Sequence, residues 1–118
     1  VSQQIAPGPF GAQLMEAVGG ATMHLAMLGL SGQVHLYTCN ATAYLEMFSQ
    51  MAVAWQLLLQ AIAAQKALDA GTNEENFYRG KIETARFYVG QTLPHALATA
   101  QMLTANERTA LDFKEEWF

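Results

Sequence analysis

The sequence predicts an all-α protein: an up-down helical bundle of three long helices followed by a short C-terminal helix. Ala, Leu, Met and Gln are frequent, and this composition favours helices because unbranched side chains lose little rotamer freedom in them. Apolar residues recur every three or four positions along most of the chain, which places them on one helical face. At 118 residues the chain is expected to form a single domain, residues 9–118, after a linker tail at 1–8.

The first helix is expected from about Pro9 to Leu28. Gly29 and the Ser31-Gly32 pair end it, because Gly readily adopts the left-handed conformation of a helix cap. Its buried face consists of apolar residues at three- and four-residue spacing: Phe10, Leu14, Val18, Ala21, Leu25 and Leu28.

The second helix is expected to be the longest, from about Gln33 to Ala70, and to end at Gly71. Its other faces are also apolar, so it is expected to lie centrally in the bundle. Alternating spacing of four and three predicts one seam of the bundle along Tyr44, Phe48, Met51, Trp55, Leu58 and Ile62.

The third helix is expected at residues 73–105, and Pro94 within it predicts a kink near residues 90–93. Thr72 with Glu75, and Thr104 with Glu107, have the spacing of capping boxes, and the second box would open a short helix ending near Phe113. The tail ends with two aromatic residues, Trp117 and Phe118, which are expected to be exposed. The buried side of the third helix is predicted to contain Tyr78, Ile82, Ala85, Val89, Leu93, Ala96, Ala100 and Leu103.

Charge is distributed very unevenly along the chain. No Lys or Arg precedes Lys66, and Glu16 and Glu46 are the only acidic residues among the first 65. A domain surface usually carries many charges, so this half is expected to be covered by the bundle or by another protein surface. The net charge of −4 gives no basic stripe for nucleic acid. These features favour an interaction role over an active site.

The lone Cys39 allows no disulfide or cysteine metal site within one chain, which favours a reducing, cytoplasmic compartment. Residues 51–64 are very apolar, but glutamines interrupt and flank them, so no transmembrane helix is predicted. The sequence starts at Val1 without an initiator Met or a signal peptide. We therefore expect it to be a section of a longer protein.

No catalytic, cofactor-binding or metal-binding residue is predicted in this chain. His24, His35 and His95 lack the Glu-x-x-His and HExxH spacings of metal sites in helices, so they are interpreted as structural or surface residues. Cys39 has no charged neighbour that would stabilise a thiolate and is interpreted as a buried, inert thiol. No Gly-rich loop has phosphate-binding spacing.

One basic cluster is a candidate interaction patch, and two interpretations of it remain open. The basic patch consists of Tyr78, Arg79, Lys81 and Arg86. On a helix, Glu83 could pair with both arginines and form a solvated ion-pair face. The same residues could instead bind an anion or a partner domain, because Arg is enriched at interfaces.

Three stretches of the sequence together resemble a known family. They are Ala43-Tyr44-Leu45-Glu46-Met47-Phe48, Ala54-Trp55, and residues 77–88 (Phe-Tyr-Arg-Gly-Lys-Ile-Glu-Thr-Ala-Arg-Phe-Tyr) continuing to Leu93-Pro94. Residues 38–104 resemble the C-terminal helical domain of bacterial acyl-CoA dehydrogenase-like flavoproteins, in the branch of the methylmercaptopropionyl-CoA dehydrogenases. The pattern in the third helix is the most specific part of this resemblance.

The resemblance implies a parent enzyme that oxidises an acyl-CoA thioester with FAD and a glutamate base, both contributed by preceding domains. This chain would then be a non-catalytic accessory domain without a cofactor of its own, packing on the dehydrogenase core or across subunits of a homo-oligomer. A stand-alone dimerising helical module is the alternative. A third hypothesis is that Lys81 or Arg86 reaches a phosphate of CoA in the whole enzyme.

Overall fold

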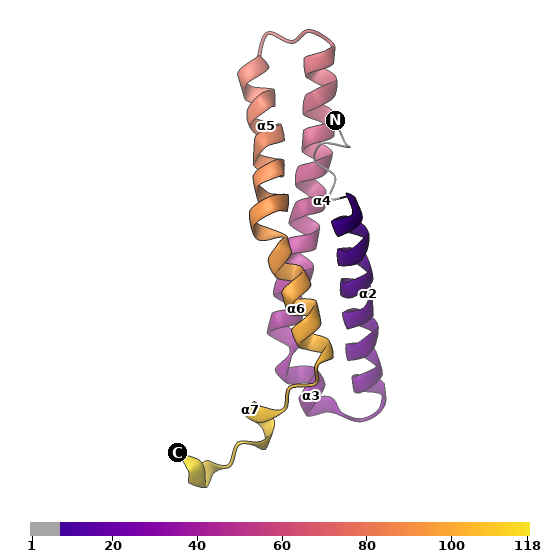
Figure 1. Ribbon diagram of the computed structural model, residues 1–118, viewed down its shortest axis with the longest axis vertical. Coiled ribbons are helices and arrows are strands. Elements are labelled where there is room, and N and C mark those ends of the chain that lie inside the picture. The colour runs from indigo at the N-terminus through magenta and orange to yellow at the C-terminus, as the bar shows by residue number, and fades with distance from the viewer. Residues whose placement is uncertain (1–7) are drawn as a thin grey trace.

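The computed structural model describes residues 8–118 as an elongated, all-helical molecule, which measures 66 × 29 × 19 Å along its principal axes (Figure 1). The predicted all-α class is confirmed. The helices, in chain order, are α2 (Gly8–Leu30), α3 (Val34–Cys39), α4 (Ala41–Asp69), α5 (Glu75–Phe87), the π-helical turn η1 (Tyr88–Thr92), α6 (Pro94–Thr104), α7 (Thr109–Asp112) and the 3-10 turn η2 (Glu115–Trp117).

The chain makes three long passes, but they do not form an even three-helix bundle. α4 packs along α5 in one half of the molecule and along α6 in the other, whereas α2 lies beside only the half that contains α6 (Figure 1). Three helices therefore pack together at one end and two at the other. The radius of gyration of 18.9 Å exceeds the roughly 13.5 Å expected for a compact chain of this length.

The predicted face of the first helix is confirmed except at Phe10, which is half-buried. Its buried residues are Leu14, Val18, Ala21, Leu25 and Leu28. The helix begins at Gly8 and ends at Leu30, close to the predicted bounds. Of the predicted linker tail, residues 1–7 lie outside the described residues and Gly8 belongs to α2.

The prediction for the second helix is wrong in two respects. The helix is interrupted at Asn40, whose Nδ2 donates a hydrogen bond to the Leu36 carbonyl oxygen at 3.0 Å. Asn side chains compete in this way with the helical backbone. The predicted seam is also only half-buried, and its Phe48 and Trp55 are exposed. The buried line is instead Met47, Ala54, Ala61 and Ala64.

The third pass bends where the sequence predicted. At η1, the N–H of Leu93 donates to the Tyr88 carbonyl at 2.9 Å, a bond across five residues that widens the helix by one residue. Pro94 then begins α6 as its first residue, a position where the missing N–H costs little. The predicted buried side is confirmed for Ile82, Ala85, Leu93, Ala96, Ala100 and Leu103, while Tyr78 and Val89 are half-buried.

Neither predicted capping box forms. Thr72 Oγ1 accepts a hydrogen bond from the N–H of Glu74 at 3.1 Å, and Glu75 pairs with an arginine instead. Thr104 Oγ1 donates to the Ala100 carbonyl at 3.2 Å, which leaves Glu107 to bind Thr109. Short hydroxyl side chains have several backbone partners within reach, so their spacing alone did not determine the cap.

Candidate functional site

The structure divides the predicted basic patch between two flanks of α5. Arg79 and Arg86 lie beside Gln65 and Asp69 of α4 in a shallow groove of about 370 Å³. Lys81 lies elsewhere, with its ammonium group 5.4 Å from the centre of the Phe77 ring. Tyr78 packs against the small core between α4 and α5. The four residues therefore do not form one cluster.

Both arginines of the basic patch are engaged in ion pairs on α5. Arg79 pairs with Glu75 at 2.6 Å, and Arg86 pairs with Glu83. The expectation that Glu83 pairs with both arginines is wrong: Glu75 and Glu83 each lie four residues from Arg79, and Arg79 pairs with Glu75. Both pairs are exposed, so each contributes little to stability. An anion-binding or docking role for this patch stays a prediction.

The histidines and the cysteine are distributed over three helices, with His35 and Cys39 together on α3. His24 Nε2 hydrogen-bonds to Oδ1 of Asn106 and so ties α2 to the loop after α6. Within residues 8–118, no group of three His, Cys, Asp or Glu side chains could hold a metal ion. Cys39 is exposed and its thiol donates to the Leu36 carbonyl, so the expectation that it is buried is wrong. It lies at the end of α3, outside the core that α4 forms.

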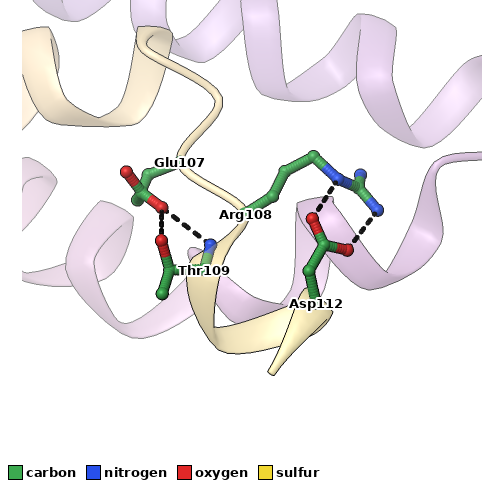
Figure 2. A network of polar contacts seen from close by, with 4 residues as sticks. All are labelled: Glu107, Arg108, Thr109 and Asp112. Atoms are coloured by element: carbon green, nitrogen blue, oxygen red, sulfur yellow. Dashed lines mark hydrogen bonds and ion pairs between the residues drawn. The ribbon is translucent and has the colours of Figure 1, made fainter. Parts of the chain in front are cut away.

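A small polar network fixes the turn before α7 (Figure 2). Glu107 accepts hydrogen bonds from the side-chain hydroxyl and the backbone N–H of Thr109, the latter at 2.7 Å. These bonds, the hydroxyl first, lower the pKa of the Glu107 carboxyl. Arg108 pairs with Asp112 at 3.3 Å. This network supports one short helix. It borders an open groove of about 510 Å³, whose other side is formed by Phe113 and Trp117.

The tail after α7 has the exposed aromatic residues that the sequence predicted. Trp117 and Phe118 are both exposed, and their rings lie 5.5 and 5.0 Å from the ring of Phe113. Lys114 lies over the Trp117 ring at 5.4 Å. The tail forms its own aromatic cluster instead of docking on the helices.

The most extensive candidate site is an apolar surface along α4. Six residues on one side of this helix, named here the α4 stripe, are Leu45, Phe48, Ala52, Trp55, Leu59 and Ile62. All except the half-buried Ile62 are exposed. An open groove of about 730 Å³ lies beside the stripe, lined by Ala12, Met15, Phe48, Trp55, Leu58 and Leu93 among others. Contiguous apolar surfaces of this kind mark interaction sites.

The scarcity of charge predicted a covered surface in this half of the chain but not its location. Phe48 and Trp55 were predicted to lie in the seam of the bundle, whereas both are exposed. A second signal was present: the stripe has its own alternating spacing of three and four residues. Two apolar faces on one helix require two neighbours, which could have been inferred from this pattern.

α4 is also long and apolar enough to cross a membrane, judged by length and composition alone, with a mean hydropathy of 1.3 over 18 residues. Core helices of soluble proteins meet the same criterion. One side of α4 packs against α5 and α6, and only 22% of the apolar window is buried in the described structure. The absence of a membrane-spanning segment stays a prediction.

Together, the fold and its surfaces define an elongated helical domain with a large uncovered apolar face. Residues 10–114 match the family described as acetyl-CoA dehydrogenase C-terminal like. The chain belongs to this family.

Two curated proteins are similar to this chain. Butyryl-CoA dehydrogenase from Syntrophomonas wolfei subsp. wolfei is 37% identical over 81 residues, which are 66% of this chain and 13% of that protein. The broad-specificity linear acyl-CoA dehydrogenase FadE5 from Mycobacterium tuberculosis is 30% identical over 81 residues, which are 67% of this chain and 13% of that protein. The chain thus spans only about 13% of the length of these relatives. No solved structure matches it significantly.

The family match supports the resemblance to acyl-CoA dehydrogenases inferred from the third helix. It does not distinguish the methylmercaptopropionyl-CoA dehydrogenase branch, because the two relatives are named for butyryl-CoA and for linear acyl-CoA substrates.

Proposed function

We propose that this chain is the non-catalytic C-terminal accessory domain of an FAD-dependent acyl-CoA dehydrogenase-like oxidoreductase of the cytoplasm. The observation that carries the proposal is the family match across residues 10–114. In this proposal the domain packs on the dehydrogenase core or across subunits, and the flavin and the catalytic base belong to the part of the enzyme outside this chain.

The two relatives support an acyl-CoA substrate for the whole enzyme. One is named a butyryl-CoA dehydrogenase and the other a broad-specificity linear acyl-CoA dehydrogenase. The methylmercaptopropionyl-CoA branch remains part of the proposal because of the pattern of Tyr78, Lys81, Thr-Ala-Arg-Phe at residues 84–87 and the Leu93-Pro94 pair.

The surface of the chain supports an accessory role. The chain exposes 7942 Å², whereas a compact monomer of 12.9 kDa exposes about 6,300 Å². The excess of about 1,600 Å² over the compact monomer follows from the elongated shape, 66 × 29 × 19 Å along the principal axes. A domain of this shape has ample surface for contact with a core or a second subunit.

The test is to purify the full-length natural gene product beside the 118-residue chain and to record visible absorption spectra and acyl-CoA oxidation. We expect a yellow, active full-length protein and a colourless, inactive short chain. A variant of the full-length protein that lacks residues 8–118 should keep the flavin chemistry and lose solubility or subunit assembly. Tight FAD binding by the short chain would contradict the proposal.

A stand-alone dimerising module is the second candidate, and the exposed α4 stripe is the observation that favours it. Under this alternative the natural gene product is itself short and colourless, and its function is association. The length of the natural protein and its colour distinguish the two candidates.

A role in substrate handling is also testable in the full-length enzyme. If Arg86 reaches a phosphate of CoA, Arg86→Ala raises the KM for acyl-CoA while the kcat changes little. The matched control is Arg79→Ala, which removes the neighbouring ion-paired arginine from the same face. An equal effect of both variants, or none, would assign Arg86 to the ion-pair face alone.

A further inference from the structure

The α4 stripe has the spacing of a coiled-coil seam. Its residues follow one another at intervals of three, four, three, four and three, an average of about 3.5 that keeps a seam in line with a second helix. From Leu45 to Ile62 the seam is about 26 Å long. Leu45, Phe48, Trp55 and Leu59 are 65%, 53%, 61% and 46% exposed. The missing neighbour is therefore a long helix.

The arrangement of the helices leaves a place for such a neighbour. α2 and α4 each pack along α6 and scarcely touch each other. The apolar groove lies between them, with the buried residues Leu14 and Leu93 among those that line it. A helix laid beside the α4 stripe would also contact Ala12 and Met15 of α2, which border the same groove. It would complete a four-helix arrangement at this end of the molecule.

We propose that α4 of a second copy of this chain occupies this place, antiparallel to the first, so that the two α4 stripes form a symmetric seam. In the register that pairs every stripe residue, Ala52 of each copy faces Trp55 of its partner, and Phe48 faces Leu59. Leu45 then faces Ile62 at both ends. Large side chains meet small ones at the centre, as close packing requires.

Two properties of the stripe favour a second copy over a different partner. First, the order of its residues is self-complementary, because every residue has an apolar counterpart when the stripe is read in reverse. A two-fold interface needs this property because the same surface faces itself. Second, neither the stripe nor the positions directly beside the seam, which include Ser49, Met51 and Gln56, carry a charge. No like charges would meet across the axis.

Large apolar side chains are exposed at and beside the stripe, among them Met15, Leu45, Phe48, Trp55 and Leu59, and a second copy would bury them. Elsewhere around its circumference α4 carries Glu46, Gln50 and Gln60, which are costly to place in lipid. These polar residues favour a protein neighbour over a bilayer.

The test is the mass of the 118-residue chain by analytical ultracentrifugation from micromolar to millimolar concentration. We expect the mass to rise from 12.9 kDa to twice that value. Phe48→Lys alone and Leu59→Glu alone should each weaken dimerisation about a hundredfold or more, because each dimer then buries two unpaired charges. Val53→Lys, at an exposed position of α4 outside the stripe, is the matched control and should leave the mass unchanged.

A charge-swap measurement tests the register. A chain with both Phe48→Lys and Leu59→Glu, or an equal mixture of the two single variants, should recover much of the dimer. In the antiparallel register the introduced ammonium group at position 48 of one copy faces the introduced carboxylate at position 59 of its partner. A parallel pairing would place like charges opposite each other in the double variant and would not recover. Circular dichroism of each variant verifies that the helices persist, since both positions are exposed in one chain.

Three results would overturn the proposal: a wild-type chain that stays monomeric at millimolar concentration, single variants that dimerise like the wild type, or no recovery in the charge swap. A monomeric wild type that binds phospholipid vesicles would assign the stripe to a membrane instead. The proposal deepens the accessory role proposed above by naming its partner, and it rests on that proposed function. Its failure would leave that role intact, because the accessory role is tested by the colour and turnover of the full-length protein.

Discussion

The two ends of the molecule are held together by different means. Where α2, α4 and α6 meet, the core contains large side chains, among them Leu14, Met47 and Leu103. Where only α4 and α5 meet, the buried residues are Ala61, Ala64, Ala85 and Ile82.

The difference teaches how two and three helices bury apolar surface. Three helices enclose a space between them that large side chains fill. Two helices enclose no such space, so their backbones must approach each other closely. The distance between their axes then depends on small residues at the contact. The three-helix end should therefore be sensitive to loss of volume and the two-helix end to gain of volume.

The largest expected effect is at the three-helix end. Leu103 is fully buried there, and Leu103→Ala should lower the free energy of unfolding by about 3 kcal/mol, since a cavity remains after truncation. Urea denaturation at low micromolar concentration, where association is minimal, measures it. The control Val53→Ala, at an exposed position of α4, should cost less than about 0.5 kcal/mol. Equal losses of unfolding free energy in the two variants would mean that positions 103 and 53 do not differ in packing.

The second-largest loss of stability is expected at the two-helix end. Ala85 is fully buried against α4, and Ala85→Leu should destabilise the fold by about 2 kcal/mol because the helices must move apart. Ala98→Leu, at an exposed position of α6, should be nearly neutral. Hydrogen exchange localises the effect: the loss of protection should be confined to α5 and the facing half of α4. A uniform loss of protection would contradict separate packing of the two ends.

Smaller changes in the free energy of unfolding, of opposite sign, are expected at two glycines of the two-helix end. Gly71 turns the chain between α4 and α5 with a φ of +84°, and no atom lies near the position of an added Cβ. Gly71→Ala should therefore cost about 1 kcal/mol from backbone strain alone. Gly80 lies within α5 with equal space around it, so Gly80→Ala should stabilise by up to about 1 kcal/mol. Thermal melts measure both changes, and destabilisation by both would refute the purely conformational explanation.

How far the sequence predicted the fold depended on how polar each helix is. In the third pass, polar residues such as Arg79 and Glu83 occupy one side, so the apolar spacing identified the buried face correctly. In α4 nearly every face is apolar, and the spacing was compatible with more than one seam. The spacing predicted a seam that is only half-buried, and Phe48 and Trp55 in it are exposed.

The sequence predicted that an uncharged interaction surface exists, but it did not predict where on the molecule this surface lies. The lack of charge before Lys66 predicted a surface covered by the bundle or by another protein, and the bundle leaves part of this half exposed. Which surface this is depends on where α2 ends relative to α4, and that is a tertiary property. The basic patch failed as a cluster because Lys81 and Arg86 lie on different flanks of α5, although they are close in sequence.

The smallest expected effect lies in the segment after α6, which belongs to neither end. Because hydrogen bonds from Thr109 lower the pKa of Glu107 in the folded chain, the charged form stabilises the turn above the ordinary pKa of glutamate, and this stabilisation is lost as the pH falls through the lowered value. Thr109→Ala removes the hydroxyl donor and keeps the backbone N–H, so the pKa should rise part of the way back. Carboxyl-carbon NMR titration measures the pKa of Glu107.

Glu107 is exposed, so the urea midpoint of the helices at neutral pH should stay unchanged in the Thr109→Ala variant. An unchanged titration of Glu107 would mean that its contact with the Thr109 hydroxyl does not persist in solution, and a shifted urea midpoint would mean that the segment is coupled to the three-helix end beside it.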